Sequence, residues 1–172
     1  YYMQQGMTLP AGAQTYTTAA DGSGTACSGS TWRTLTAAQF TTLSAACERL
    51  LPRDADPGAI DLGVPIYIDR MIAAPELASA REVIVRLLPA LDRQSRKRFA
   101  GRNFADAAPD EQDLLLTAWQ RGAAGERRFF QTVLDLTLEG AFGDLKYGGN
   151  AGGRGFAMIG FAPGPPMAMP HH

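Results

Sequence analysis

The sequence predicts an all-α fold: a compact helical bundle of about five helices, with an extended N-terminal arm and an extended Gly/Pro-rich C-terminal tail. Apolar residues recur at helical spacing between residues 36 and 142, and no series of alternating strands appears there. The flanking segments are rich in Gly, Ser, Thr or Pro and lack a sustained period. We therefore expect an arm over 1–33, a helical domain over 34–143 and a partner-docking tail over 144–172.

The first three helices each carry a local signal. Thr36 and Gln39 have the spacing of a capping box, in which each side chain satisfies a free backbone N–H, so the first helix is expected from there to Pro52. A short second helix has Pro65 in its first turn. A longer helix opens near residue 75, and Pro89 should kink or split it because proline removes a helical hydrogen bond.

Two further helices complete the expected domain. Pro109 and the acidic residues after it suit a helix start, and Gly122 suits its end. The last helix is expected from about residue 126 to residue 142. Beyond it, the proline-dense run 162–170 must be extended, because such a backbone cannot join a helix or a central strand. An ordered tail of this kind needs a surface to lie on.

Charge and hydropathy narrow the possible partners. The formal net charge of -1 gives no basis for nucleic-acid binding, and no apolar stretch is long enough to cross a bilayer. A local basic surplus is interpreted as a solvated helix face in preference to an anion site. It comprises Arg93, Arg96, Lys97, Arg98 and Arg102.

Groups for catalysis or redox chemistry are scarce. The only histidines, His171 and His172, end an irregular tail, so histidine-based nucleophilic schemes and di-iron motifs are not expected in the folded body. We expect no catalytic residue, no cofactor site and no metal site in this chain. Two alternatives stay open. One is a carboxylate pair, Asp135 and Glu139, which share a helix face. The other is a soft metal site built from the tail residues Met158, Met167, Met169, His171 and His172.

Seven segments together resemble the gluconate 2-dehydrogenase subunit 3 family. The most specific part is Tyr-Gly-Gly-Asn at 147–150, followed by Ile-Gly-Phe at 159–161, and the resemblance covers roughly residues 33 to 161. The segments are 35–39, 47–52, 58–65, 67–69, 137–140, 144–150 and 155–161.

The resemblance implies a non-catalytic small (gamma) subunit of a membrane-bound, periplasmic dehydrogenase for a sugar or sugar acid, such as fructose, glucose or gluconate. In such complexes a large subunit carries FAD and the chemistry, and a multihaem cytochrome c passes electrons to the membrane. The small subunit supports maturation, stability and twin-arginine export of the large one. We therefore expect a periplasmic protein that is membrane-associated through its partner. The alternative is a stand-alone periplasmic enzyme or metal-binding helical protein.

The resemblance also directs attention to the tail as the contact with the large subunit, since aromatic residues dominate interface energetics. The alternative is that these residues pack back on their own helices, and both can hold. The expected contact residues are Tyr147, Gly148, Gly149, Asn150, Phe156, Ile159 and Phe161.

An oxidising periplasm, as the resemblance implies, would allow Cys27 and Cys47 to pair. That bridge would close a loop of about 20 residues and stabilise by roughly 3 kcal/mol. Two alternatives stay open: one cysteine pairs with the partner, or Cys47 is a buried free thiol.

Overall fold

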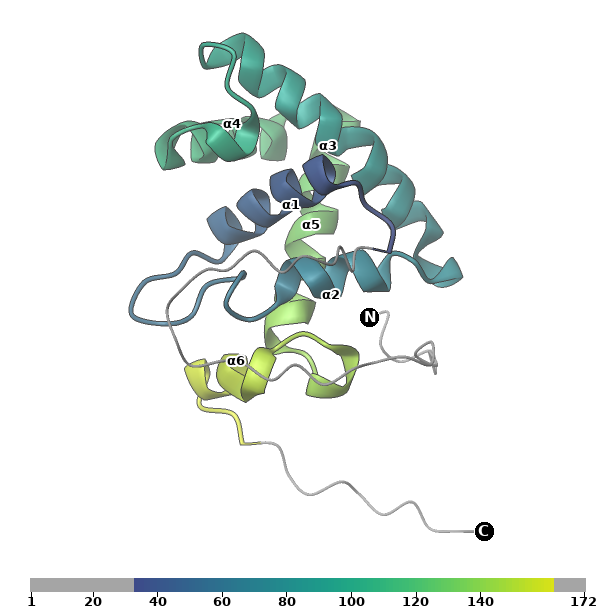
Figure 1. The fold of residues 1–172 in the computed structure, drawn as a ribbon, viewed down its shortest axis with the longest axis vertical. Helices are drawn as coiled ribbons and strands as arrows, with labels where there is room; N and C mark the ends of the chain where they lie inside the picture. The colour runs from purple at the N-terminus through teal and green to yellow at the C-terminus, as the bar shows by residue number, and fades with distance from the viewer. Residues whose placement is uncertain (1–32, 163–172) are drawn as a thin grey trace. The chain divides into compact units, whose positions relative to one another are not determined.

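The structure, a computed structural model, describes residues 33–162, and this part contains α-helices and short 3₁₀ turns but no strand. The predicted all-α class is therefore confirmed (Figure 1). The helices are α1 (Ala37–Leu50), α2 (Val64–Met71), α3 (Ala78–Arg98), α4 (Pro109–Arg121), α5 (Ala124–Phe142) and α6 (Arg154–Met158). The 3₁₀ turns are Pro75–Leu77, Phe104–Asp106, Leu145–Tyr147 and Ala151–Gly153.

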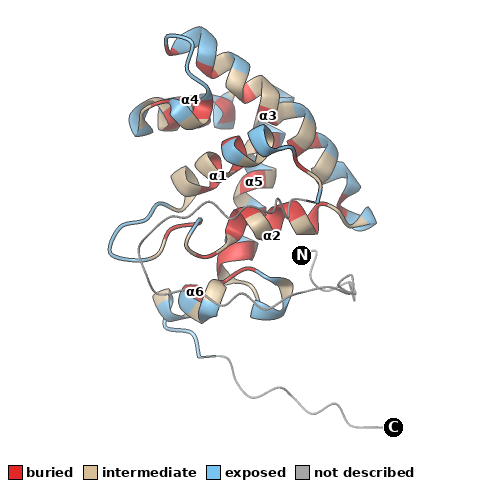
Figure 2. Ribbon diagram, viewed as in Figure 1, coloured by how far each residue is buried: buried red, intermediate tan, exposed pale blue. Residues whose placement is uncertain are grey.

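Helix α5 is the centre of the bundle. It packs against α1, α2, α3 and α4, and it leads down to α6 at its C-terminal end (Figure 1). Phe129, Val133 and Leu136 on α5 are buried, and Figure 2 shows the buried residues gathered on the facing sides of the helices. No helix among residues 33–162 is both long and apolar enough to cross a membrane.

A short, partly buried polar chain joins three helices at the edge of the apolar core. Trp119 of α4 packs edge-on against Phe129, with ring centroids 5.1 Å apart. Its indole N–H donates to Gln94 Oε1 of α3 at 2.8 Å, and Gln94 Nε2 donates to Glu126 Oε1 of α5 at 2.8 Å. A buried tryptophan N–H needs such a partner, and here the partner also fixes how α3, α4 and α5 meet.

The expected helix starts are found with small shifts. Thr36 and Gln39 form the capping box of α1, and prolines stand in the first turns of α2 and α4. Helix α5 begins at Ala124, two residues before the expected start. The reason is that the Glu126 carboxylate accepts the Ala123 N–H at 2.9 Å and therefore belongs to the first turn.

The expected split at Pro89 is wrong, because α3 runs uninterrupted from Ala78 to Arg98. Proline has no N–H, so the Val85 carbonyl one turn earlier loses its helical donor. Gln39 Nε2 of α1 donates to that carbonyl at 3.0 Å. Gln39 Oε1 also accepts the Thr36 N–H at 2.9 Å, so one side chain both caps α1 and repairs α3.

The described part of the C-terminal tail, residues 144–162, folds back onto the helical domain. Residues 145–147 and 151–158 form short helical turns that lie against the end of α5 and the turn before α2. Positive φ angles at Gly148 (87°), Asn150 (49°) and Gly152 (68°) reverse the chain. The arm over 1–32 and the residues from 163 onward lie outside the described part.

The repair of α3 by Gln39 can be tested with a double-mutant cycle. We expect Gln39→Glu to lower the free energy of unfolding by about 2 kcal/mol, because a carboxylate keeps the α1 cap but cannot donate to the Val85 carbonyl. In a Pro89→Ala background the restored N–H should reduce that loss by about 1 kcal/mol. Urea unfolding of the four proteins measures the coupling. The same loss in both backgrounds would contradict the repair.

Candidate functional site

Asn150 holds the chain against the end of α5. The residue is fully buried, and its backbone N–H donates to the Gly140 carbonyl at 2.6 Å. Its side-chain Nδ2 donates to the Gly143 carbonyl at 3.1 Å, and its Oδ1 accepts the Gly155 N–H at 2.7 Å. We call these three bonds the Asn150 clamp. They satisfy carbonyls that the last turn of α5 leaves free and also fix the start of α6.

Glycines let two backbones meet at this clamp. A Cβ atom on Gly149 would overlap the Gly140 carbonyl, and one on Gly155 would overlap the Ala141 carbonyl. The Tyr67 ring of α2 packs against Gly140, where a Cβ would lie 2.7 Å from Tyr67 Cδ1. The clamp therefore requires glycine at positions 149 and 155 for space, and the packing of α2 on α5 requires it at position 140.

A second attachment joins this segment to the turn before α2. The Ala151 N–H donates to the Leu62 carbonyl at 3.1 Å. The Arg154 guanidinium donates to the Asp61 carbonyl in the same turn. The segment is thus held at both the end of α5 and the start of α2, and α6 has a fixed orientation on the body.

Held in this way, residues 144–162 present apolar side chains to solvent. Three of the six exposed large hydrophobic residues in the described part lie here: Leu145 (44% exposed), Ile159 (58%) and Phe161 (53%). Phe156 is half-buried and meets the Phe161 ring edge-on, with centroids 5.0 Å apart. We call Ile159 and Phe161, which follow α6 in the chain, the apolar patch, and Figure 2 shows exposed residues over α6.

The seven predicted contact residues divide into two groups. Gly149 and Asn150 are buried and pack against their own helix α5. The other five reach the surface to different degrees. Gly148, Ile159 and Phe161 are exposed, whereas Tyr147 and Phe156 are half-buried. Lys146 Nζ lies 4.8 Å from the centroid of the Tyr147 ring. Contact with a partner stays a prediction for all seven.

Asp69 has a role that the sequence reading missed. Its carboxylate is buried, with 2% of the residue exposed, and accepts the N–H groups of Arg33 (2.6 Å), Thr34 (3.1 Å) and Leu35 (2.9 Å). It therefore holds the backbone of residues 33–35 against α2. The available signal was an aspartate directly after Ile68 on a helix whose other charged residue is Arg70, since buried carboxylates are paired or hydrogen-bonded.

Cys47 is buried, and its sulfur lies 3.5 Å from the Thr137 hydroxyl, which donates a weak hydrogen bond to it. Burial raises the pKa of the Cys47 thiol to about 12, which suppresses the reactive thiolate. Cys27 lies outside the described residues. The bridge between the two cysteines therefore stays a prediction.

Of the alternative carboxylate pair, only Glu139 is in an unusual environment. It is half-buried, and burial, with the nearby Asp135, raises its pKa above the ordinary value. Burial and the Glu139 charge raise the pKa of Tyr67, whose hydroxyl makes no hydrogen bond within standard geometry. Asp135 is exposed and accepts from Gln131 Nε2 at 2.7 Å. The Glu139 carboxylate thus lies in a half-buried environment, whereas the Asp135 carboxylate lies in solvent.

Most of the tail residues predicted as alternative ligands of a soft metal lie outside the part of the chain that the structure describes. Met158 is half-buried at the end of α6, while Met167, Met169, His171 and His172 lie outside the described residues. Between residues 33 and 162, no three His, Cys, Asp or Glu side chains gather closely enough to hold a metal ion.

The fold and this site define an all-α protein whose C-terminal segment is clamped to a central helix and carries an exposed apolar patch. The chain belongs to the gluconate 2-dehydrogenase subunit 3 family, whose model matches residues 37–164. The match includes both the Asn150 clamp and the apolar patch. It places the chain among accessory subunits of dehydrogenase complexes. Searches among curated proteins and among solved structures found no match.

The Asn150 clamp predicts a large effect from one substitution. We expect Asn150→Gly to lower the free energy of unfolding by about 3 kcal/mol, because glycine keeps the positive φ but leaves the Gly143 carbonyl and the Gly155 N–H unpaired. Amide exchange over residues 151–158 should accelerate. Asn103→Gly, at an exposed asparagine, is the matched control. Unchanged exchange in residues 151–158 would show that other contacts hold the segment.

Glu139 should make stability depend on pH. Its pKa is raised in the folded state, so its contribution is fully present below the unfolded value of about 4.3 and is lost as pH rises through the folded value. We expect Glu139→Gln to raise Tm near neutral pH, with the gain vanishing below about pH 4. Thermal unfolding against pH measures this. An equal Tm gain at pH 4 and at pH 7 would contradict the assignment to Glu139.

Proposed function

We propose that this chain is the non-catalytic small subunit of a heteromeric, flavin-dependent dehydrogenase for a sugar or sugar acid. In this role it binds the FAD-containing large subunit and supports that subunit's maturation, export and stability. FAD and haem c belong to the partner subunits, and the complex works in the periplasm, attached to the membrane through the cytochrome subunit. The family match supports the general assignment to a dehydrogenase complex.

The observation that carries the proposal is the clamped apolar patch. Ile159 and Phe161 are more than half exposed, although apolar side chains gain free energy when they leave water. The Asn150 clamp holds them on a fixed backbone, so a partner would not have to order the segment on binding. Exposed apolar residues that lie close together on a fixed backbone are typical of a protein-binding site.

Loss of the patch should weaken the complex without unfolding the subunit. We expect Ile159→Ser and Phe161→Ser, made separately, each to weaken binding of the large subunit by at least about tenfold, because aromatic and aliphatic anchors carry most interface energy. Co-expression of both subunits, purification through the large one and titration of the complex would measure the affinity.

Leu114→Ser provides the matched control. Leu114 lies on α4 and is 50% exposed. Its substitution by serine therefore removes an exposed apolar side chain, as the two patch variants do, but at a different surface. It should leave the affinity unchanged. Equal binding by all three variants would exclude the patch as the docking site. Normal yield of exported, FAD-loaded large subunit in cells that lack this chain would contradict the escort role.

A further inference from the structure

A row of cations runs along the exposed side of α3. Arg86, Arg93 and Lys97 are separated by seven and four residues, which places them on one face of the helix, and all three are exposed. They lie in the described part without an ion pair to any carboxylate there. Glu82, one turn before Arg86, is the single acidic residue in that row.

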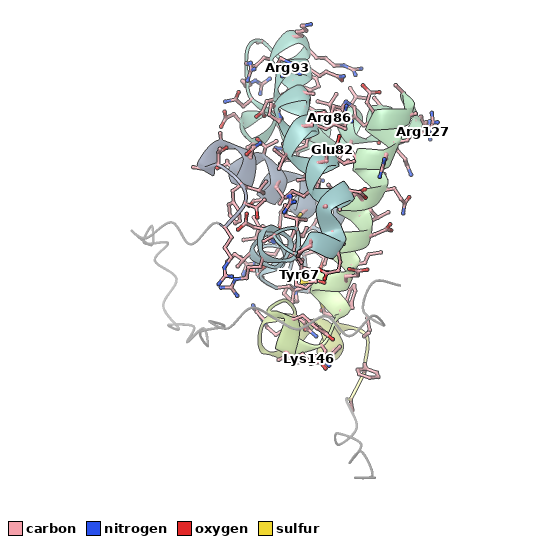
Figure 3. The ribbon with its side chains drawn as sticks, turned by 90° about the vertical axis from the view of Figure 1, so that its right-hand side faces the viewer. Tyr67, Glu82, Arg86, Arg93, Arg127 and Lys146 are labelled. Carbon is pink, nitrogen blue, oxygen red and sulfur yellow. The ribbon has the colours of Figure 1, made fainter. Side chains whose placement is uncertain are left out.

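The start of α5 adds two arginines to this row. The Arg128 guanidinium donates to Ser79 Oγ at 3.3 Å, while Gln94 donates to Glu126 at 2.8 Å. The first turns of α5 therefore cross α3 between residues 79 and 94, in the region of Arg86. Figure 3 shows Arg86 and Arg93 along α3 and Arg127 at the start of α5. We call Arg86, Arg93, Lys97, Arg127 and Arg128 the basic face.

Helix electrostatics account for only part of this charge. Lys97 lies in the last turn of α3, where a cation interacts favourably with the helix dipole. Arg86 is in the middle of α3 and has no such benefit. Arg128 lies near the N-terminus of α5, where the same dipole disfavours cations. The Arg127 guanidinium instead donates to the Gly122 carbonyl at 2.6 Å, at the C-terminus of α4, where a cation is favoured. The Glu126 carboxylate is already engaged with Gln94 and with the Ala123 N–H.

We propose that the basic face is a second docking surface, which receives an acidic surface of a partner protein. This inference rests on the proposed function, since it requires a protein partner. Arginine favours such a surface because its planar guanidinium binds carboxylates in a bidentate manner. A lipid surface is less suitable. None of the exposed large hydrophobic residues of the described part lies on α3 or in the first turns of α5 to insert into a bilayer.

The two docking surfaces would act at different stages of binding. They lie at opposite ends of α5, whose 19 residues span about 28 Å. Charges attract over distances up to the Debye length, so the basic face accelerates encounter. Apolar contact acts only after close approach, so the apolar patch mainly slows dissociation. The basic face thus controls the association rate and orients the subunit.

The test uses the full-length chain and the flavoprotein subunit co-purified with it. We expect Arg86→Gln/Arg93→Gln to lower the association rate constant about tenfold at low salt, with the difference disappearing at high salt. The dissociation rate should change little. Thr117→Glu/Gln120→Glu, at exposed positions of α4, changes net charge by the same amount and should have little effect on the rate.

Each outcome decides the inference. Equal rates for the arginine variant and wild type, or equal slowing by the α4 control, would overturn it. If no flavoprotein co-purifies, the proposed function fails. Retention on poly-L-glutamate then tests the basic face alone: it is supported if only the arginine variant elutes earlier and overturned if the variant and wild type elute together. Stronger binding to phosphatidylglycerol vesicles than to polyglutamate would assign the face to lipid and overturn the acidic protein partner.

Discussion

The arrangement of residues 144–162 depends on one buried asparagine. Asn150 supplies a backbone donor, a side-chain donor and a side-chain acceptor within one residue, and it tolerates the left-handed conformation the chain needs there. Leucine or alanine could not replace any of these side-chain bonds. Because the clamp draws two backbones together, Gly149 and Gly155 must lack side chains. The orientation of α6, and hence of the apolar patch, follows from this contact.

Much of the helical body could be predicted from sequence because its signals are local. Capping residues and prolines mark helix starts, and apolar spacing marks the faces that α5 gathers into one core. The shape of residues 144–158 could not be predicted in the same way. The apolar residues of that segment show no helical or strand spacing. Its structure depends on close backbone contacts at glycines and on the side-chain amide of Asn150, whose partners lie in other parts of the chain. The split expected at Pro89 is absent for a related reason, since the compensating donor is on another helix.

The resemblance to a known family located the candidate site in the sequence. It did not predict which of the site residues hold the segment in place and which are exposed to a partner. A motif such as Tyr-Gly-Gly-Asn does not reveal which members are buried. Here Gly149 and Asn150 position the segment, whereas Ile159 and Phe161 project from it. Asp69 escaped notice because its partners are backbone N–H groups, which carry no residue-type signal. The only indication was that Asp69 is a charged residue among the apolar residues of α2. This position predicts that the carboxylate is buried, but it does not predict which groups bind it.

The bond between Gln39 and the Val85 carbonyl affects how the bundle assembles. The two residues are 46 positions apart, so the bond exists only when α1 has docked on α3. Before docking, α3 alone carries an unsatisfied carbonyl beside Pro89 and is prone to fray there. The docking of α1 and the formation of an unbroken helix α3 are therefore coupled. A proline within the longest helix thus makes the folding of this small domain more cooperative.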